Sequence, residues 1–262
     1  FRPSSVDPTS RPTLKMTPTA SLLLLLLLGL SQAHPLQEEE SEEEVPDDTV
    51  DITTRILTSN NGTDEILLEG DLLAPRTRNA MRCWSQSCLW RKGSNGLVVI
   101  PFTVSREFTS WERQKIDSAM KCLPQQDLHS LPGCFSALGR VGGRQVLSLN
   151  RQGCIYHGIV QHEINHALGF QHEQTRSDRD NHVRINWENI NPQMAYNFYK
   201  QSTNNLNTPY DYSSIMHYGK TAFSIQYGRD SITPIPDPNA QIGQRQGMSY
   251  WDIMRIHRLY GC

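Results

Sequence analysis

Three histidines and one glutamate lie close together in the stretch HEINHALGFQH. If the stretch is helical, residues four apart stand on one face about one turn apart, so His162 and His166 can bind a single ion. Glu163 is rotated by about 100° from His162 and can contact a water on that ion without binding the ion itself. Gly169 allows a turn that would strain a residue with a Cβ, and His172 can then return as a third ligand.

The chemistry that these residues predict is peptide hydrolysis at zinc. Three neutral imidazoles leave the fourth position of the ion open for water, which is typical of catalytic rather than structural zinc. Such zinc lowers the pKa of its water toward about 7, and Glu163 would act as the general base. The simpler interpretation is a surface helix with scattered histidines. His-Glu-x-x-His alone arises by chance in roughly one such chain in a hundred, but the added Gly and His reduce this to about one in a hundred thousand. We therefore expect an endopeptidase with one Zn²⁺ per chain.

The residues around the histidines predict the helix that must position them. In residues 158–170, Ile159, Ile164 and Leu168 follow helical spacing. Gly169 is placed to end that helix.

The rest of the first half predicts a mixture of strands and helix. Residues 96–104 and 144–151 are apolar or alternating and predict strands. Residues 110–121 predict a helix that Ser110 caps. The fold class is therefore α+β.

The second half predicts less regular structure. Residues 171–247 are rich in Asn, Pro, Tyr and Gly and predict irregular backbone. The chain closes with a predicted helix over residues 249–262, in which Ser249 and Asp252 form a capping pair.

The start of the chain has the features of a secretory signal. The apolar run before Ala33 is shorter than the about 20 residues that span a bilayer, and small residues precede the expected cut. Met16 is the natural initiator, so residues 16–33 form the expected signal peptide and residues 1–15 an upstream extension. We expect a secreted protein, with storage in secretory granules before release.

An acidic segment precedes a basic body. Residues 34–78 carry 13 acidic and 3 basic side chains, against 13 acidic and 19 basic in residues 79–262. The simpler interpretation is a solvated acidic tail, and the alternative is a detachable propeptide that docks on the body with the help of opposite charge. Asn61 begins the sequon NGT, which suits a glycosylated, solvent-facing segment. The basic residues up to Arg78 predict an activating protease that cuts at Arg78–Asn79.

All six cysteines lie in the basic body. In a chain that is expected to reach an oxidising compartment they predict disulfides, whose pairing spacing alone leaves open. A zinc site built from cysteines is the alternative, but the sequence has no Cys-x-x-Cys pair.

The stretches HEINHALGFQHEQTRSDRD and SIMHYG resemble the astacin family of metzincin metallopeptidases, and residues 79–262 are most similar to its teleost hatching enzymes, the choriolysins. The resemblance implies a two-lobed catalytic domain. Its N-terminal lobe would hold a twisted β-sheet and the zinc-binding helix, and its irregular C-terminal lobe would end in a helix. Matched by motif, His162, His166 and His172 are the zinc ligands and Glu163 is the base.

Further roles follow only from the resemblance. Met216 matches the Met-turn, a hydrophobic floor beneath the zinc, and Tyr218 matches a tyrosine that ligates zinc and supports the oxyanion. Without the resemblance, both would be interpreted as core residues. Glu173 matches the glutamate that meets the new amino terminus, so Asn79 is its expected partner. LLEGDL resembles the Phe-x-Gly-Asp latency motif, in which Asp71 would occupy the open zinc position of the zymogen.

The resemblance also implies a disulfide plan and reveals one departure. The implied pairs are Cys83–Cys88, Cys122–Cys262 and Cys134–Cys154. Family members lay down two strands between the first helix and the following Gly-Cys, whereas residues 120–134 cross that interval in far fewer residues and with two prolines. The N-terminal sheet is therefore expected to be truncated.

The implied substrate is the glycoprotein of the egg envelope, digested at hatching. Two alternatives stay open: an astacin that processes extracellular matrix or growth-factor precursors, and a non-catalytic pseudo-protease. Retention of Glu163 and the three histidines favours catalysis, and the short interval 120–134 favours the pseudo-protease. We expect no nucleic-acid partner, no membrane span and a monomer.

Overall fold

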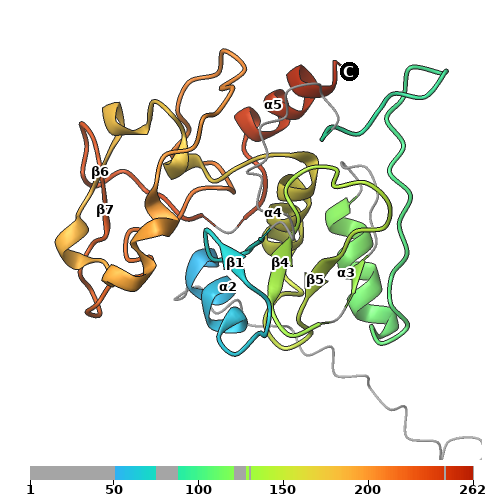
Figure 1. Cartoon of the computed structure of the whole chain (residues 1–262), viewed down its shortest axis with the longest axis horizontal. Helices are drawn as coiled ribbons and strands as arrows, with labels where there is room; N and C mark the ends of the chain where they lie inside the picture. Colours follow the sequence, from blue (N-terminus) through green and yellow to red (C-terminus); the bar gives the residue numbers. More distant parts are fainter. Residues whose placement is uncertain (1–50, 75–87, 121–127, 130, 245, 262) are drawn as a thin grey trace, which may run out of the picture. The chain divides into compact units, whose positions relative to one another are not determined.

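The computed structural model describes residues 51–74, 88–120, 128–129, 131–244 and 246–261 (Figure 1). The chain divides into two compact units, Phe1–Asp47 and Asp48–Cys262, and every described residue belongs to the second. Several expectations lie outside the described residues: the signal peptide, the extension before it, the cleavage site Arg78–Asn79, and Cys83, Cys122 and Cys262. In the part of the chain that is described, no helix is long and apolar enough to cross a membrane.

Helix α4, His157–Leu168, is the central element of the N-terminal lobe. All of its residues from Gly158 onward are buried, and strands β4 and β5 and helices α2 and α3 pack against it. The helix ends at Gly169, whose φ of 104° is left-handed and whose amide donates to the carbonyls of Asn165 and His166. The predicted helix and its end at Gly169 are confirmed.

A five-stranded sheet packs against α4, in the order β1-β2-β4-β5-β3 (Figure 1). Its strands are β1 Leu67–Leu68, β2 Leu72–Leu73, β3 Leu128–His129, β4 Cys134–Ser136 and β5 Leu147–Leu149. Strand β4 is antiparallel to β5 and parallel to β2, with Leu72 opposite Ser136. The strand predicted within residues 144–151 is confirmed as β5. Two of the five strands belong to the acidic segment.

The acidic segment also contributes helix α2, Ile52–Asn60, which Asp51 caps by accepting from the Thr54 amide. The helix packs against β4, and Ile52 and Ile56 are buried in the same hydrophobic core as α4. Residues 51–74 are therefore docked on the body and are not a solvated tail.

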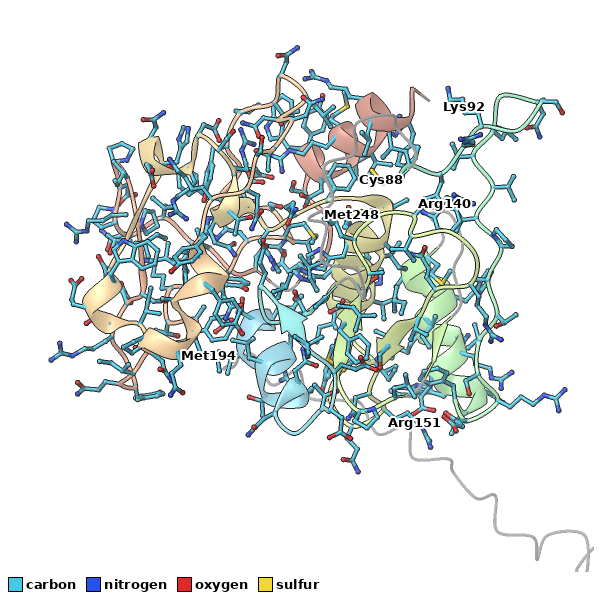
Figure 2. The ribbon with its side chains drawn as sticks, viewed as in Figure 1. Cys88, Lys92, Arg140, Arg151, Met194 and Met248 are labelled. Carbon is cyan, nitrogen blue, oxygen red and sulfur yellow. A yellow bond between two sulfur atoms is a disulfide. The ribbon has the colours of Figure 1, made fainter. Side chains whose placement is uncertain are left out.

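Helix α3, Ser110–Met120, packs against α4. The prediction that Ser110 caps this helix is wrong, because Ser110 is already helical. Thr109 and Glu112 form the reciprocal cap, with the Glu112 amide donating to Thr109 Oγ1 at 3.3 Å and the Thr109 amide to Glu112 Oε2 at 2.6 Å. Arg151, which is labelled in Figure 2, donates to the same carboxylate at 2.8 Å.

The strand predicted over residues 96–104 is wrong. These residues form single bridges only, such as Lys92 with Val98. The side chains alternate as a strand would, since Ile100 is 1% exposed while Leu97 and Val99 are 60% and 65% exposed. A strand needs a neighbour to accept its hydrogen bonds, and among the described residues of the short interval before β4 the only strand is β3, which pairs with β5. Residues 121–127 and 130 of that interval lie outside the described residues, so the truncation of the sheet stays a prediction.

The second half is irregular, as predicted. It contains four short 3₁₀ helices: η1 Glu173–Thr175, η2 Arg179–Asn181, η3 Trp187–Asn189 and η4 Pro192–Phe198. Antiparallel strands β6 Val183–Ile185 and β7 Ile232–Pro234 enclose part of a second hydrophobic core. The closing helix α5, Tyr250–Tyr260, has the predicted capping box of Ser249 and Asp252. The overall fold is α+β.

Candidate metal centre

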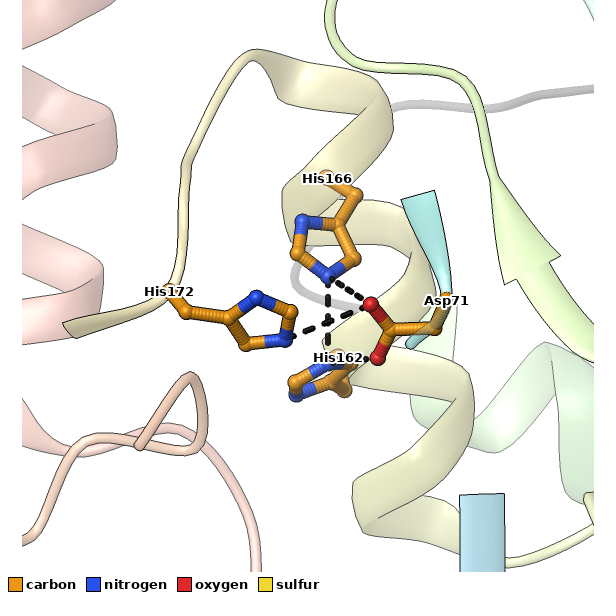
Figure 3. A group of neighbouring side chains, drawn as sticks. All are labelled: Asp71, His162, His166 and His172. Atoms are coloured by element: carbon orange, nitrogen blue, oxygen red, sulfur yellow. Dashed lines mark hydrogen bonds and ion pairs between the residues drawn. The ribbon is translucent and has the colours of Figure 1, made fainter. Parts of the chain in front are cut away.

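Four side chains converge on one buried point (Figure 3). Ligand atoms of Asp71, His162, His166 and His172 all lie within 4.8 Å of one another. The Nε2 atom of His162 is 3.0 Å from Asp71 Oδ2, and those of His166 and His172 are each 3.3 Å from Asp71 Oδ1. Helix α4 presents the first two imidazoles, and the backbone that turns after Gly169 presents the third.

The outer nitrogen of each imidazole has its own hydrogen-bond acceptor at 2.8 Å. The acceptors are the Ile215 carbonyl for His162, the Phe170 carbonyl for His166 and the Glu69 carboxylate for His172. A carbonyl can only accept, so the Nδ1 atoms of His162 and His166 carry protons and their Nε2 lone pairs point into the centre. This is the tautomer that a metal ligand requires.

The inner atoms fit a cation. The Nε2 atoms of His162 and His166 face each other at 3.1 Å. Among the described residues, His172 Nε2 and Asp71 Oδ1 have no hydrogen-bond partner although both are buried. Unpaired polar atoms are costly to bury, and one divalent ion would satisfy all of them. Three imidazole nitrogens and one carboxylate oxygen are a donor set typical of zinc.

The electrostatics of the centre favour positive charge beside Asp71. Burial raises the pKa of Asp71, but His172, His166 and the close contact with His162 outweigh it and hold this pKa well below its usual range. Burial lowers the pKa of His172, but Asp71 and Glu69 outweigh it and raise this pKa to about 9. Burial dominates at His166 and lowers its pKa to about 4.

Glu163 lies on α4 outside the group of four. Its side chain is fully buried, and among the described residues neither carboxylate oxygen has a hydrogen-bond partner. Burial and the nearby charge of Asp71 raise the pKa of Glu163 well above its usual range. A carboxyl group with a raised pKa is suited to taking and returning a proton near neutral pH.

Met216 and Tyr218 lie beside the centre, in the segment between η4 and β7. Met216 is buried in the same hydrophobic core as α4. The ring of Tyr218 is 4.6 Å from that of His172, between centroids. The Tyr218 hydroxyl donates to the backbone carbonyl of Glu69, so the acidic segment holds it in place.

Gly70 allows the acidic segment to approach the centre. Its φ is 82°, and a Cβ there would lie 2.5 Å from Leu57 Cδ2. The next residue, Asp71, is fixed by its own carbonyl, which accepts from the Ser136 amide at 3.0 Å. Glycine is therefore needed for Asp71 to reach the imidazoles.

Asn60 is a site residue that the sequence does not reveal. Its side-chain nitrogen donates to the carbonyls of Gly70 and Cys134 at 2.8 and 2.7 Å, and its oxygen accepts from the Cys134 amide at 2.6 Å. The Asn60 amide therefore joins the end of α2 to the latency stretch and to β4. Asn60 is marked in the sequence only by its place before the pair Asn61-Gly62 at a helix end, and such a run signals no more than a turn.

Glu173 is buried, but its described partners differ from the expected one. Arg255 donates to both of its oxygens at 2.7 and 2.9 Å, Arg176 donates at 3.1 Å and the Asp211 amide at 2.7 Å. Asn79 lies outside the described residues. The sequence does not reveal Arg176, whereas Arg255 lies on the buried face of the amphipathic helix α5, where a charged residue signals a paired partner.

The described cysteines agree with a disulfide-bonded body. Cys134 and Cys154 form a disulfide that joins β4 to the segment before α4. Cys88 is disulfide-bonded, and its expected partner lies outside the described residues. Asn61, the predicted glycosylation acceptor, is exposed at the end of α2.

Comparisons with known proteins agree with this geometry. Residues 88–261 match the family model for astacin, which is described as a peptidase family. High choriolytic enzyme 1 of Oryzias latipes is 61% identical over 269 residues, which cover 95% of this chain and 100% of that protein. Low choriolytic enzyme of the same fish is 48% identical over 266 residues, which cover 93% and 98%. The solved structure of high choriolytic enzyme 1, described as a hatching enzyme zinc-protease from medaka, superposes with a TM-score of 0.67 at 63% identity and covers 70% of this chain and 100% of that one.

Proposed function

The chain belongs to the astacin family of peptidases, and from that premise we propose that it is a zinc-dependent endopeptidase that digests the egg envelope at hatching. Similarity to choriolytic enzymes along almost the whole chain supports this substrate over matrix or growth-factor precursors. The same similarity favours an active enzyme over a pseudo-protease.

The observation that carries the proposal is the convergence of three imidazole Nε2 atoms whose Nδ1 atoms are already engaged. His162, His166 and His172 would hold one Zn²⁺. When bound, zinc polarises the peptide carbonyl and makes water a nucleophile near neutral pH.

The chain's own residues would carry out the proton transfers. Glu163 is one residue from His162 on α4, and its raised pKa suits a group that takes a proton from water and returns it to the leaving amine. Tyr218 becomes free to donate to the developing oxyanion once the Glu69 carbonyl has left.

Residues 34–78 would act as a propeptide that keeps the enzyme latent. Asp71 occupies the position beside the three imidazoles that substrate and water would need. Cleavage at Arg78–Asn79 would release the body, residues 79–262. Secretion through residues 16–33 would deliver the latent form, with Asn61 glycosylated.

Glu163→Gln tests the proposed role of Glu163. The variant should keep one zinc per chain, because Glu163 is outside the group of four, and should lose turnover by about 10²–10⁴-fold, the usual contribution of a general base. Metal content and hydrolysis of casein and isolated egg envelope, with and without a chelator, measure the two effects after propeptide removal.

The matched control is Glu188→Gln, which changes an exposed glutamate in the second half of the chain. It should retain full activity and full zinc. A fully active Glu163→Gln variant would refute the role of the base, and a wild-type chain without stoichiometric zinc would refute the proposed function.

A further inference from the structure

Asp252 is a buried carboxylate, 3% exposed, that accepts hydrogen bonds from the turn leading to Met216. Its Oδ1 accepts from Ser214 Oγ at 2.6 Å, and its Oδ2 accepts from the Ile215 amide at 2.9 Å. Oδ2 also accepts from the Ser249 amide at 2.9 Å, which closes the capping box of α5. One carboxylate therefore fixes both the start of α5 and the turn before Met216.

Further hydrogen bonds connect this turn to His162, a proposed zinc ligand. Ser214 Oγ, which donates to Asp252, accepts from the Met216 amide at 3.1 Å. The carbonyl of that same peptide unit belongs to Ile215 and accepts from His162 Nδ1 at 2.8 Å. A continuous set of hydrogen bonds thus runs from the Asp252 carboxylate through Ser214 and one peptide group to the imidazole, and all its residues are buried.

We infer that Asp252 is a positioning residue for the metal ligand His162, acting through Ser214 and the Ile215–Met216 peptide. The inference rests on the proposed zinc site. An anionic acceptor at one end polarises the hydrogen bonds that follow it, so the Ile215 carbonyl becomes a better acceptor for Nδ1–H. A stronger outer hydrogen bond orients the imidazole and raises the basicity of its metal-facing nitrogen.

The competing explanation is that Asp252 only caps α5. The cap has a second, separable half, because Ser249 Oγ accepts from the Asp252 amide at 3.0 Å. Ser249→Ala removes that half and leaves every bond from Asp252 to the Met-turn in place. It is therefore the matched control for a purely structural role.

The test measures zinc binding by the full-length chain rather than hydrolysis. Asp252→Asn keeps the shape of the side chain and removes its charge. We expect its dissociation constant for zinc, measured by competition with a chelating dye, to rise about tenfold or more, as for other outer partners of metal ligands. The absorption bands of the Co²⁺-substituted chain should shift as well. Ser249→Ala should change the dissociation constant by less than about twofold and leave the Co²⁺ bands unchanged.

A second variant keeps the test decisive if Asp252→Asn does not fold. Ser214→Ala breaks the set of hydrogen bonds after Asp252 but keeps the bond from the Ile215 amide, so it should weaken zinc binding less and shift the Co²⁺ bands in the same direction. Wild-type zinc affinity and bands in either folded variant overturn the inference alone. A wild-type chain that binds no zinc overturns the proposed function and the inference together.

Discussion

The proposed propeptide and helix α5 both contact the surroundings of the metal centre, but by different means. The propeptide contacts it directly, since Asp71 faces the inner nitrogens of the imidazoles and Glu69 accepts from His172 Nδ1. Helix α5 contacts it only through other residues. Arg255 binds Glu173, which follows His172, and Asp252 holds the turn that holds His162. In the proposed function, the propeptide blocks the site until it leaves, whereas α5 stays and supports the residues around the site.

Asp71→Asn should have the largest effect, because it changes the residue by which the proposed propeptide contacts the metal centre directly. In the uncleaved chain it removes a buried charge worth about 3–5 kcal/mol to the docked propeptide. Proteolytic activity of the uncleaved chain should therefore rise by about 10²–10³-fold, whereas the processed enzyme should not change because it lacks the residue. Casein hydrolysis, with the uncleaved state checked by mass spectrometry, measures both.

The control is Asp64→Asn, which alters an exposed carboxylate of the same segment and should leave the chain latent. Equal latency of Asp71→Asn and the wild type would remove Asp71 from the inhibitory role.

Arg255→Met should affect both forms of the chain alike. Glu173 would lose two hydrogen bonds and keep only Arg176 as a charged partner, so the free energy of unfolding should fall by about 3 kcal/mol, as when a buried ion pair is broken. Urea denaturation of the uncleaved and processed chains measures this. Arg258→Met, on the exposed side of α5, should cost far less. A loss of stability in only one of the two forms would contradict the view that α5 supports the site both before and after cleavage.

His217 should make the stability of the processed body, residues 79–262, sensitive to acid. Its Nε2 atom is 2.7 Å from the Tyr210 hydroxyl, and burial lowers the pKa of His217 to about 4. Its pKa in the unfolded chain is about 6.5, so below that pH the unfolded state binds the proton first. Stability that is full above about pH 6.5 is therefore lost as the pH falls toward 4, by about 3 kcal/mol in total.

His217→Gln should reduce this loss. Free energies of unfolding of the processed chain at pH 7 and at pH 4.5, for wild type and variant, give the comparison. Parallel losses in the two proteins would show that His217 is not the group responsible.

Asn60→Ala should have the smallest effect, and only on the uncleaved chain. The Cys134 amide and carbonyl would each lose a partner, which costs about 1–3 kcal/mol of propeptide docking. Hydrogen exchange in residues 51–74 should become faster. Thr58→Ala, exposed two residues earlier on α2, should leave the exchange rates unchanged. Unaltered exchange in Asn60→Ala would mean that this amide does not secure the propeptide.

The sequence predicts well what depends on local spacing. His162 and His166 lie one turn apart, and Gly169 reverses the backbone before His172, so the group of ligands follows from eleven consecutive residues. The cap of α5 by Ser249 is equally local.

Partners distant in sequence could not be predicted. His162 finds its outer acceptor 53 residues away and His172 finds its acceptor 103 residues away. No local pattern encodes such a pairing, which depends on how the segments pack. The strand predicted over residues 96–104 failed for the same reason, since its alternation is real but strand formation requires a neighbour.

The backbone of Glu69 has a consequence for how latency ends. Its φ of 50° lies in the left-handed region, which costs a residue other than glycine about 1–2 kcal/mol. The docked segment keeps this strained backbone only while its contacts on both sides of Glu69 hold it in place. Once the chain is cut, the freed peptide relaxes as it dissociates and must be strained again to return. If residues 34–78 are released as proposed, the strain at Glu69 would favour their departure over their return.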